Sequence, residues 1–136
     1  LNGQQGTFYM GDTGHPAPRG TATGTPLVKG ASQTGNTLET DGWSTGVTGI
    51  VKAGDWLQVG SSSSRQLVQV VADADSDGSG NATLEIWPRI RTAFADNTAI
   101  ATASPKGVWR LTEPVGFGWD TDLFARGITF TCMEAF

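Results

Sequence analysis

The clearest alternation of apolar and polar residues in the chain lies at residues 82–87. Leu84 and Ile86 fall on one side of an extended strand with this pattern, and Glu85 and Trp87 fall on the other. Successive side chains of a strand point to opposite faces, so a period of two indicates a strand with one buried face. The pattern therefore predicts a strand at 82–87 whose Leu84 and Ile86 enter the core.

A second apolar segment, rich in valine, precedes this strand at residues 66–72 and is expected to pair with it. Pro88 is expected to end the strand, because proline cannot donate a hydrogen bond to a β-ladder. The last strand, 124–134, is expected to be long and continuous. The other short strands are predicted at 6–10, 26–29, 37–41, 55–59, 99–103, 107–111 and 117–120, with turns at 42–46 and 61–64.

Composition favours the same all-β class. The chain of 136 residues contains 19 Gly and 6 Pro distributed along its length, and both residues break helices and supply turns. No helix is predicted, apart from room for one turn at 91–96. A chain of this length forms one domain, or one domain with a small appendage. Several short strands between turns indicate a barrel or a sandwich.

The charge of the chain limits the classes of partner that it is expected to bind. The formal net charge is −4, which argues against a nucleic-acid partner because such proteins carry a basic surface. Only 16% of the residues are charged, and a sparsely charged surface fits burial in an assembly. No apolar run approaches 18 residues, so membrane insertion is not expected. The start at Leu1-Asn2-Gly3, without Met, predicts that the chain is part of a longer protein.

The chain contains few cysteine and histidine side chains for catalysis or metal binding. Cys132 is the only cysteine and lies in an apolar, strand-like setting, which favours a small buried hydrophobe over a nucleophile. His15 is the only histidine and lies in a loop rich in Gly and Pro. A zinc site cannot be assembled from one Cys and one His at the usual spacings. No metal, cofactor or catalytic residue is predicted from this pair.

An Asp-rich segment follows the strand 66–72 and offers a calcium site as one interpretation. Asp73, Asp75 and Asp77 match the first acidic positions of a calcium-binding loop. The acidic residue that should close the loop comes one residue late, at Glu85, and Gly80 replaces the usual apolar residue. The alternative is a polar hairpin connection, in which Asp and Gly supply turn conformations. The sequence favours the hairpin.

A pair of acidic residues near the C-terminus provides the weakest hypothesis. Asp120 and Asp122 are two residues apart and would share one face of a strand. Two carboxylates can hydrolyse a glycosidic bond when they face each other across a cleft. The sequence does not establish such a cleft, and solvated turn residues are the favoured interpretation.

Aromatic and arginine side chains are the remaining candidates for recognition. Tryptophan can stack on a sugar or a base, although it more often anchors a core or an interface. Trp43 and Trp56 flank Gly-rich turns, which favours partial exposure. Arg89 and Arg91 flank an isoleucine and could contact a carboxylate, a phosphate or another subunit. The five tryptophans are Trp43, Trp56, Trp87, Trp109 and Trp119, and of these Trp43, Trp56 and Trp119 join the two arginines as ligand or interface candidates.

The order of these segments resembles a known family. GDWLQVG at 54–60 is followed by LVQV at 67–70, ADADSDGSGNATL at 72–84 and IWPRIR at 86–91. This succession is similar to that of the distal tail proteins of long-tailed bacteriophages and prophages. LNGQQGTFYMGD at 1–12 and GITFTCMEAF at 127–136 also resemble segments of that family, so the resemblance covers most of the chain.

The resemblance implies a structural, non-enzymatic protein of the virion tail tip, assembled in the bacterial host cytoplasm. In the family, a ring that is commonly hexameric joins the tail tube to the tip or baseplate and contacts the tail hub. The resemblance implies an all-β chain in which a small OB-like β-barrel, residues 21–105, is inserted between strands of a partial β-sandwich ring domain, residues 1–20 and 106–136. The N-terminal part of that ring domain is missing here.

One alternative function remains beside the structural one. The barrel could bind carbohydrate and contact a host surface polysaccharide through its tryptophans and turn acids. A hydrolase built on paired acids is a third and weaker hypothesis, because the sequence shows no convergent catalytic set.

Overall fold

The structure is a computed structural model, and it describes residues 5–119 and 125–135. The chain divides into two compact units, an outer unit of residues 1–10 and 108–136 and a barrel unit of residues 11–107. The barrel unit is thus inserted into the outer unit along the chain. Each unit builds its own β-sheets.

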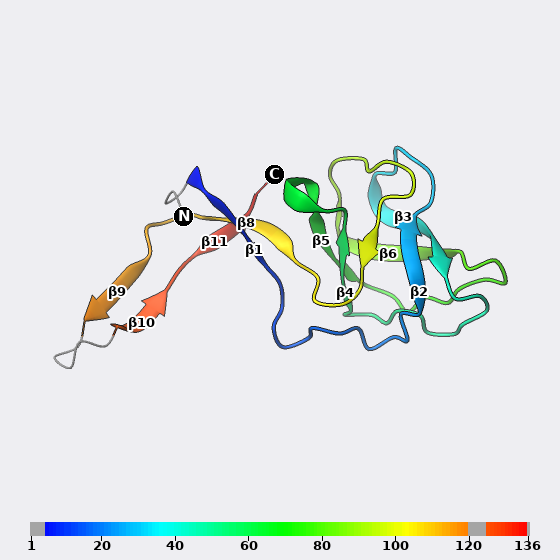
Figure 1. Ribbon diagram of the computed structural model, residues 1–136, viewed down its shortest axis with the longest axis horizontal. Helices are drawn as coiled ribbons and strands as arrows, with labels where there is room; N and C mark the ends of the chain where they lie inside the picture. The colour runs from blue at the N-terminus through cyan, green and yellow to red at the C-terminus, as the bar shows by residue number, and fades with distance from the viewer. Residues whose placement is uncertain (1–4, 120–124, 136) are drawn as a thin grey trace. The chain divides into compact units, whose positions relative to one another are not determined.

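Six strands form a single antiparallel sheet in the barrel unit (Figure 1). Their order across the sheet is β2-β3-β6-β5-β4-β7, and a bridge between Leu27 and Ala99 connects β2 to the residue before β7, at the other edge. The sheet therefore closes on itself into a barrel. Its strands are β2 (Gly24–Val28), β3 (Gly35–Trp43), β4 (Trp56–Val59), β5 (Gln66–Val70), β6 (Ala82–Ile90) and β7 (Ile100–Ala101).

Alternation along the strands places the core inside the barrel. Leu84 and Ile86 on β6 are almost fully buried, while Glu85 and Trp87 face the outside, as the sequence pattern predicts. The buried members from the six strands and their loops make one apolar cluster: Val28, Leu38, Trp43, Ile50, Val51, Leu57, Val59, Val68, Val70, Ala82, Leu84, Ile86, Ile90 and Ile100. The predicted all-β fold, with a small barrel inserted between strands of a second sheet, is confirmed.

The prediction that Pro88 ends its strand is wrong, because β6 continues to Ile90. Pro88 lies where the pairing between β3 and β6 shifts register, a place where a missing N–H is tolerated. The Gln66 side chain bridges the irregular stretch. Its Nε2 donates to the Arg89 carbonyl at 2.7 Å, and its Oε1 accepts from the Arg91 N–H at 3.3 Å.

Other strand limits also differ from the sequence prediction. The predicted turn at 42–46 begins within β3, which continues to Trp43 because Gly24 of β2 still pairs there. Strand β5 ends at Val70, two residues earlier than predicted. The predicted turn at 61–64 contains a short 3₁₀ helix, η2 (Ser62–Ser64). Residues 91–96 form no helical turn.

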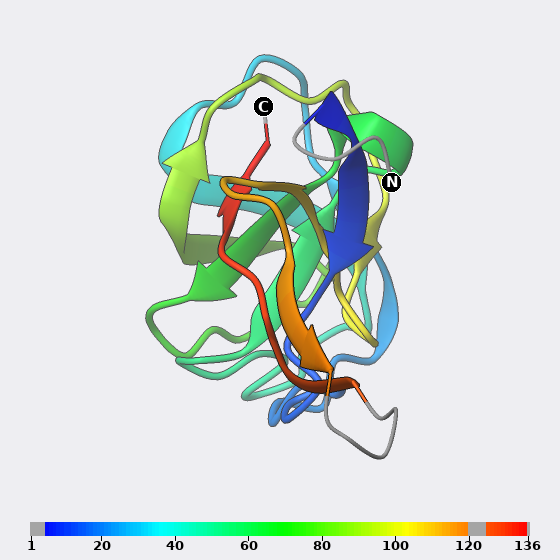
Figure 2. The ribbon, with the colours of Figure 1, turned by 90° about the vertical axis from the view of Figure 1, so that its left-hand side faces the viewer.

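The outer unit contains two small sheets (Figures 1 and 2). The first has the order β1-β8-β11, and the second is the antiparallel pair β9 and β10. Trp109 on β8 donates its indole N–H to the Met10 carbonyl of β1 at 2.8 Å. The strands are β1 (Thr7–Met10), β8 (Gly107–Leu111), β9 (Gly116–Trp119), β10 (Ala125–Thr129) and β11 (Cys132–Glu134).

The predicted continuous strand at 124–134 is wrong. The described part of this segment forms two strands with different partners, β10 against β9 and β11 against β8. The chain changes partner at Thr131, whose carbonyl accepts from the N–H of Thr112 at 3.0 Å and from its hydroxyl at 3.1 Å. Cys132 on β11 is half-buried rather than buried. Across the part of the chain that is described, no helix is long and apolar enough to cross a membrane.

The two hydrogen bonds of the Gln66 side chain predict that it stabilises the fold by more than its packing volume does. Gln66→Met preserves the length of this buried side chain but removes both hydrogen bonds to the chain beyond Pro88. We expect a loss of about 1–2 kcal/mol in the free energy of unfolding, measured by urea denaturation, because buried backbone groups lose their partners. Glu85→Ala, at an exposed position of β6, is the control with a change near zero. Equal stability of Gln66→Met and the wild type would contradict the bridge.

Candidate functional site

Three side chains form a row across the outer face of the barrel. Strand pairing places Trp56 of β4 opposite Gln69 of β5, and Gln69 opposite Trp87 of β6. Residues directly opposite in antiparallel strands project from the same face of the sheet. The residues next to them along the strands are buried: Leu57, Val68, Val70 and Ile86. Because successive side chains of a strand point to opposite faces, Trp56, Gln69 and Trp87 face outward. We call these three residues the outer tryptophan row.

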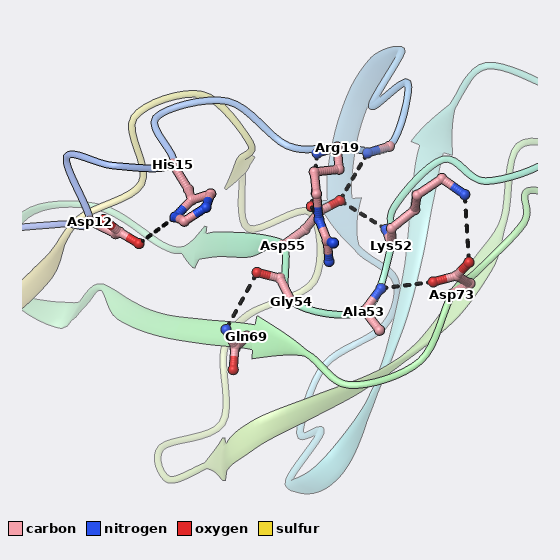
Figure 3. A network of polar contacts seen from close by, with 10 residues as sticks. Asp12, His15, Arg19, Lys52, Ala53, Gly54, Asp55, Gln69 and Asp73 are labelled. Atoms are coloured by element: carbon pink, nitrogen blue, oxygen red, sulfur yellow. Dashed lines mark hydrogen bonds and ion pairs between the residues drawn. The ribbon is translucent and has the colours of Figure 1, made fainter.

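The row presents aromatic surface to solvent with an amide between its ends. Trp87 is 62% exposed, the highest fraction among the exposed large apolar side chains in the described residues. Trp56 is half-buried. The Gln69 Nε2 donates to the Gly54 carbonyl at 3.4 Å (Figure 3), which holds the amide on the face. This combination of aromatic planes and a polar group between them can recognise a ligand with an apolar face and hydroxyl edges.

The surroundings of the row carry both charge signs. Glu85 is exposed two residues before Trp87 in the regular part of β6, hence on the same face. Arg89 is exposed beyond the irregular stretch at Pro88. Val71, whose N–H donates to the Glu85 carbonyl at 2.9 Å, is 50% exposed. The exposed Arg19 guanidinium lies beside Gly54, near the other end of the row. The row itself is therefore uncharged, and charges of both signs flank it.

The structure places the residues that the sequence suggested as ligand or interface contacts in different parts of the fold. Trp56 belongs to the row, and Arg89 flanks it. Arg91 is exposed just beyond β6, where its N–H meets Gln66. Trp119 is the last residue of β9, in the outer unit, and pairs with Ala125. The structure therefore brings together only Trp56 and Arg89, with Trp87 and Gln69 added.

Trp43 belongs to the barrel core and not to its surface. It is only 4% exposed, and its indole N–H donates to the Thr40 hydroxyl at 2.8 Å. Thr40 is fully buried and in turn donates to the Ala82 carbonyl at 2.7 Å. Trp43 is thus buried away from any ligand. It anchors the core, which is the second role that the sequence allowed for the tryptophans.

Sequence reasoning counted Trp87 among the five tryptophans that could stack on a ligand but did not select it, and it gave no role to Gln69. A signal for Trp87 was available, because it alternates with Leu84 and Ile86 and must therefore face away from the core. Gln69 carries no comparable signal. Its place between two tryptophans depends on the register of three strands, and sequence periodicity does not give register across strands.

The Asp-rich connection between β5 and β6 caps neighbouring turns. The backbone of Ala74 bridges to Val51, so the connection is bound to residues 44–53 and is not a simple hairpin turn. Its three carboxylates accept backbone N–H groups at separate places: Asp73 from Ala53 at 2.8 Å, Asp75 from Gly49 at 2.6 Å, and Asp77 from Ser79 at 2.7 Å and Asn81 at 2.8 Å. Among the described residues, no three His, Cys, Asp or Glu side chains converge as a metal site.

A buried carboxylate fixes the same end of the barrel (Figure 3). Asp55 is 4% exposed and accepts N–H groups from Arg19 at 2.8 Å, Gly20 at 3.0 Å and Lys52 at 2.8 Å. The Arg19 Nε also lies 3.5 Å from its Oδ1. Gly20 passes so close to Ile50 that a side chain there would meet the backbone. Asp55 thus joins the segment entering the barrel to the turn before β4.

The environment lowers the pKa of several of these carboxyl groups. For Asp55, burial opposes ionisation most strongly, but the three N–H donors and the Arg19 charge outweigh it and lower the pKa. For Asp73, the N–H of Ala53 is the largest cause of a lowered pKa, and Lys52 adds to it from 3.5 Å. These carboxylates are therefore charged caps at neutral pH.

Two further candidates have no place in the site. His15 is exposed, and its Nδ1 lies 2.9 Å from Oδ2 of Asp12 within the same loop. This contact, together with the N–H of Gly14, lowers the pKa of Asp12. The acidic pair Asp120 and Asp122 lies outside the described residues.

Comparison with known proteins adds no assignment. A scan against protein-family models finds no match to this chain, and a search of curated proteins finds none either.

The anchor at Asp55 predicts a pH-dependent contribution to stability. In Asp55→Asn an amide N–H group replaces one acceptor oxygen and confronts a backbone donor, so we expect a loss of about 2 kcal/mol in unfolding free energy at neutral pH. Because the pKa of Asp55 is lower when folded than its ordinary value of 3.8, its stabilisation is complete above that pH and is lost as pH falls through the folded pKa.

The difference between the wild type and Asp55→Asn should accordingly shrink below pH 3.8, which urea melts at several pH values would measure. Asp73→Asn, a substitution at an exposed cap of the same turn, is the matched control and should have the smaller effect at neutral pH. A difference for Asp55→Asn that stays constant down to pH 2 would show that charge is not what stabilises this turn.

Proposed function

We propose that this chain is part of a structural protein of a bacteriophage or prophage tail tip, which self-associates into a ring through its outer unit. The observation that carries the proposal is the distribution of exposed apolar side chains. Four of the six large exposed ones in the described residues belong to the outer unit: Tyr9, Val115, Phe130 and Met133. Apolar side chains gathered on a small unit are typical of a surface that another protein covers.

The aromatic residues of the outer unit support the same conclusion. Phe8 and Phe130 make an edge-to-face contact with ring centroids 6.2 Å apart, although Phe130 remains 50% exposed. Tyr9 and Met133 are 49% and 43% exposed on the two outermost strands of the first sheet, β1 and β11. Aromatic residues and methionine are the types enriched in protein interfaces.

The edges of this sheet offer the means of association. Strand β1 reads Thr7-Phe8-Tyr9-Met10 and contains neither a charge nor a proline. Natural proteins usually protect an edge with charges, proline or a covering segment, since an open edge pairs with other chains. A β1 edge that adds to a strand of the next copy would make a head-to-tail contact, and such contacts form a ring when the rotation between copies closes.

The resemblance of residues 54–91 and of both ends of the chain to distal tail proteins supports the identity of the ring. On this proposal the ring, commonly a hexamer in the family, joins the tail tube to hub or tip proteins. The inserted barrel would then be of the OB type carried by many members of the family. Ladders and apolar contacts would carry the function, which requires no catalysis.

Ring formation predicts that the whole protein, of which this chain is a part, self-associates through the outer unit. Met133→Lys puts a charge on an exposed position of β11 and should weaken association by about tenfold or more, because the charge must be desolvated in the contact. Light-scattering mass as a function of concentration, with electron microscopy of the largest species, would measure this.

Val71→Lys is the matched control, since Val71 is also half-exposed but lies on the barrel. It should leave the association unchanged. A whole wild-type protein that stays monomeric at every concentration, or a Val71→Lys defect as large as that of Met133→Lys, would contradict the proposal.

A further inference from the structure

The outer tryptophan row has no evident role in folding. A tryptophan that is 62% exposed leaves most of its apolar area in water, where it adds little to stability. The core side of the same strand is complete without it, because Leu84, Ile86 and Ile90 fill the barrel. Trp87 thus carries a large aromatic surface to a place where any polar residue would serve the fold.

The geometry of the row fits a ligand that extends across the strands. Neighbouring strands are ~4.8 Å apart, so the backbones at Trp56 and Trp87, two strands apart, are separated by ~10 Å. Gln69 lies between them, and its amide has one N–H on the Gly54 carbonyl at 3.4 Å, with an acceptor oxygen beside it. A ligand lying along the row would meet an aromatic plane, a hydrogen-bonding group and a second aromatic plane.

The charges around the row select among stacking ligands. A nucleic-acid strand stacks its bases on aromatic rings but also requires a cationic groove along its phosphates. Here the cations near the row, Arg19, Lys52 and Arg89, are accompanied by the exposed acids Asp73 and Glu85, and the net charge of the whole chain is −4. A neutral saccharide matches this uncharged row, because a pyranose ring has an apolar face for the indole and hydroxyl groups for the amide.

We propose that the outer tryptophan row, Trp56, Gln69 and Trp87, is a binding site for a neutral saccharide chain. Two sugar rings stack on the two indoles, and the Gln69 amide hydrogen-bonds to the sugar hydroxyls between them. This site lies wholly on β4, β5 and β6 of the barrel, and it does not depend on whether the outer unit forms a ring.

Binding can be measured with the intact chain, using an array of neutral microbial polysaccharides and, in solution, maltohexaose, cellohexaose and chitohexaose with tryptophan fluorescence and calorimetry as readouts. We expect the wild type to bind at least one neutral saccharide. Trp87→Ala and Trp56→Ala should each weaken that binding by about tenfold or more, since each removes one stacking plane. Gln69→Ala should weaken it less.

Two variants separate recognition from folding. Trp87→Phe keeps an aromatic ring and should restore part of the affinity that Trp87→Ala loses. Trp109→Phe changes a tryptophan in the outer unit and should bind as the wild type does. Thermal melts of each variant would show whether the barrel is intact.

Three results would overturn the proposal. The first is the absence of binding to every neutral saccharide tested. The second is saccharide binding that persists unchanged in folded Trp56→Ala and Trp87→Ala. The third is a preference for oligothymidylate or for an acidic polysaccharide over all neutral saccharides, which would assign the face to another ligand class. Failure of ring assembly would leave these measurements interpretable, because the row lies wholly on strands of the barrel unit.

Discussion

The two-residue alternation of strand β6 is the constraint on which the rest of the structure depends. β6 pairs with β3 on one side and with β5 on the other, so it lies in the middle of the sheet that closes into the barrel. Its inward residues Leu84 and Ile86 join the apolar core, and the same alternation leaves Trp87 outside. A slip of one residue would exchange the two faces and bury Trp87 and Glu85 together. The core and the candidate binding row are therefore two consequences of one register.

Polar side chains supply hydrogen-bond acceptors to backbone N–H groups outside the strands. The loops at one end of the barrel expose many backbone N–H groups, and buried N–H groups need partners. Asp55 and Asp73 supply acceptors to the adjacent N–H groups of Lys52 and Ala53, and Asp75 supplies one to Gly49. Ser76 joins its own loop to Val47 and Ser44. The segment that first suggested a calcium loop thus caps backbone N–H groups at separate places.

The sequence revealed the class of fold because periodicity and turn residues are local signals. The strand at 82–87 and its inward face could be read from six residues. The continuation of β6 past Pro88 could not, because it depends on the Gln66 side chain, which is distant in sequence. The burial of Trp43 depends on Thr40 and Ala82, and the division of the last strand depends on two different partner strands. Only Trp56 of the outer tryptophan row was selected as a candidate from the sequence. Placing Gln69 and Trp87 beside it required the register between strands. In each case the missing information was a contact between residues far apart in the chain.

One register buries the core and aligns Trp56, Gln69 and Trp87 on the outer face. Nuclear Overhauser contacts between backbone protons of paired strands report which residues face each other in solution. We expect cross-strand contacts that pair Trp56 with Gln69 and Gln69 with Trp87. Contacts that instead pair Gln69 with Ile86 or with Pro88 would show a slipped register and contradict both the core assignment and the binding row.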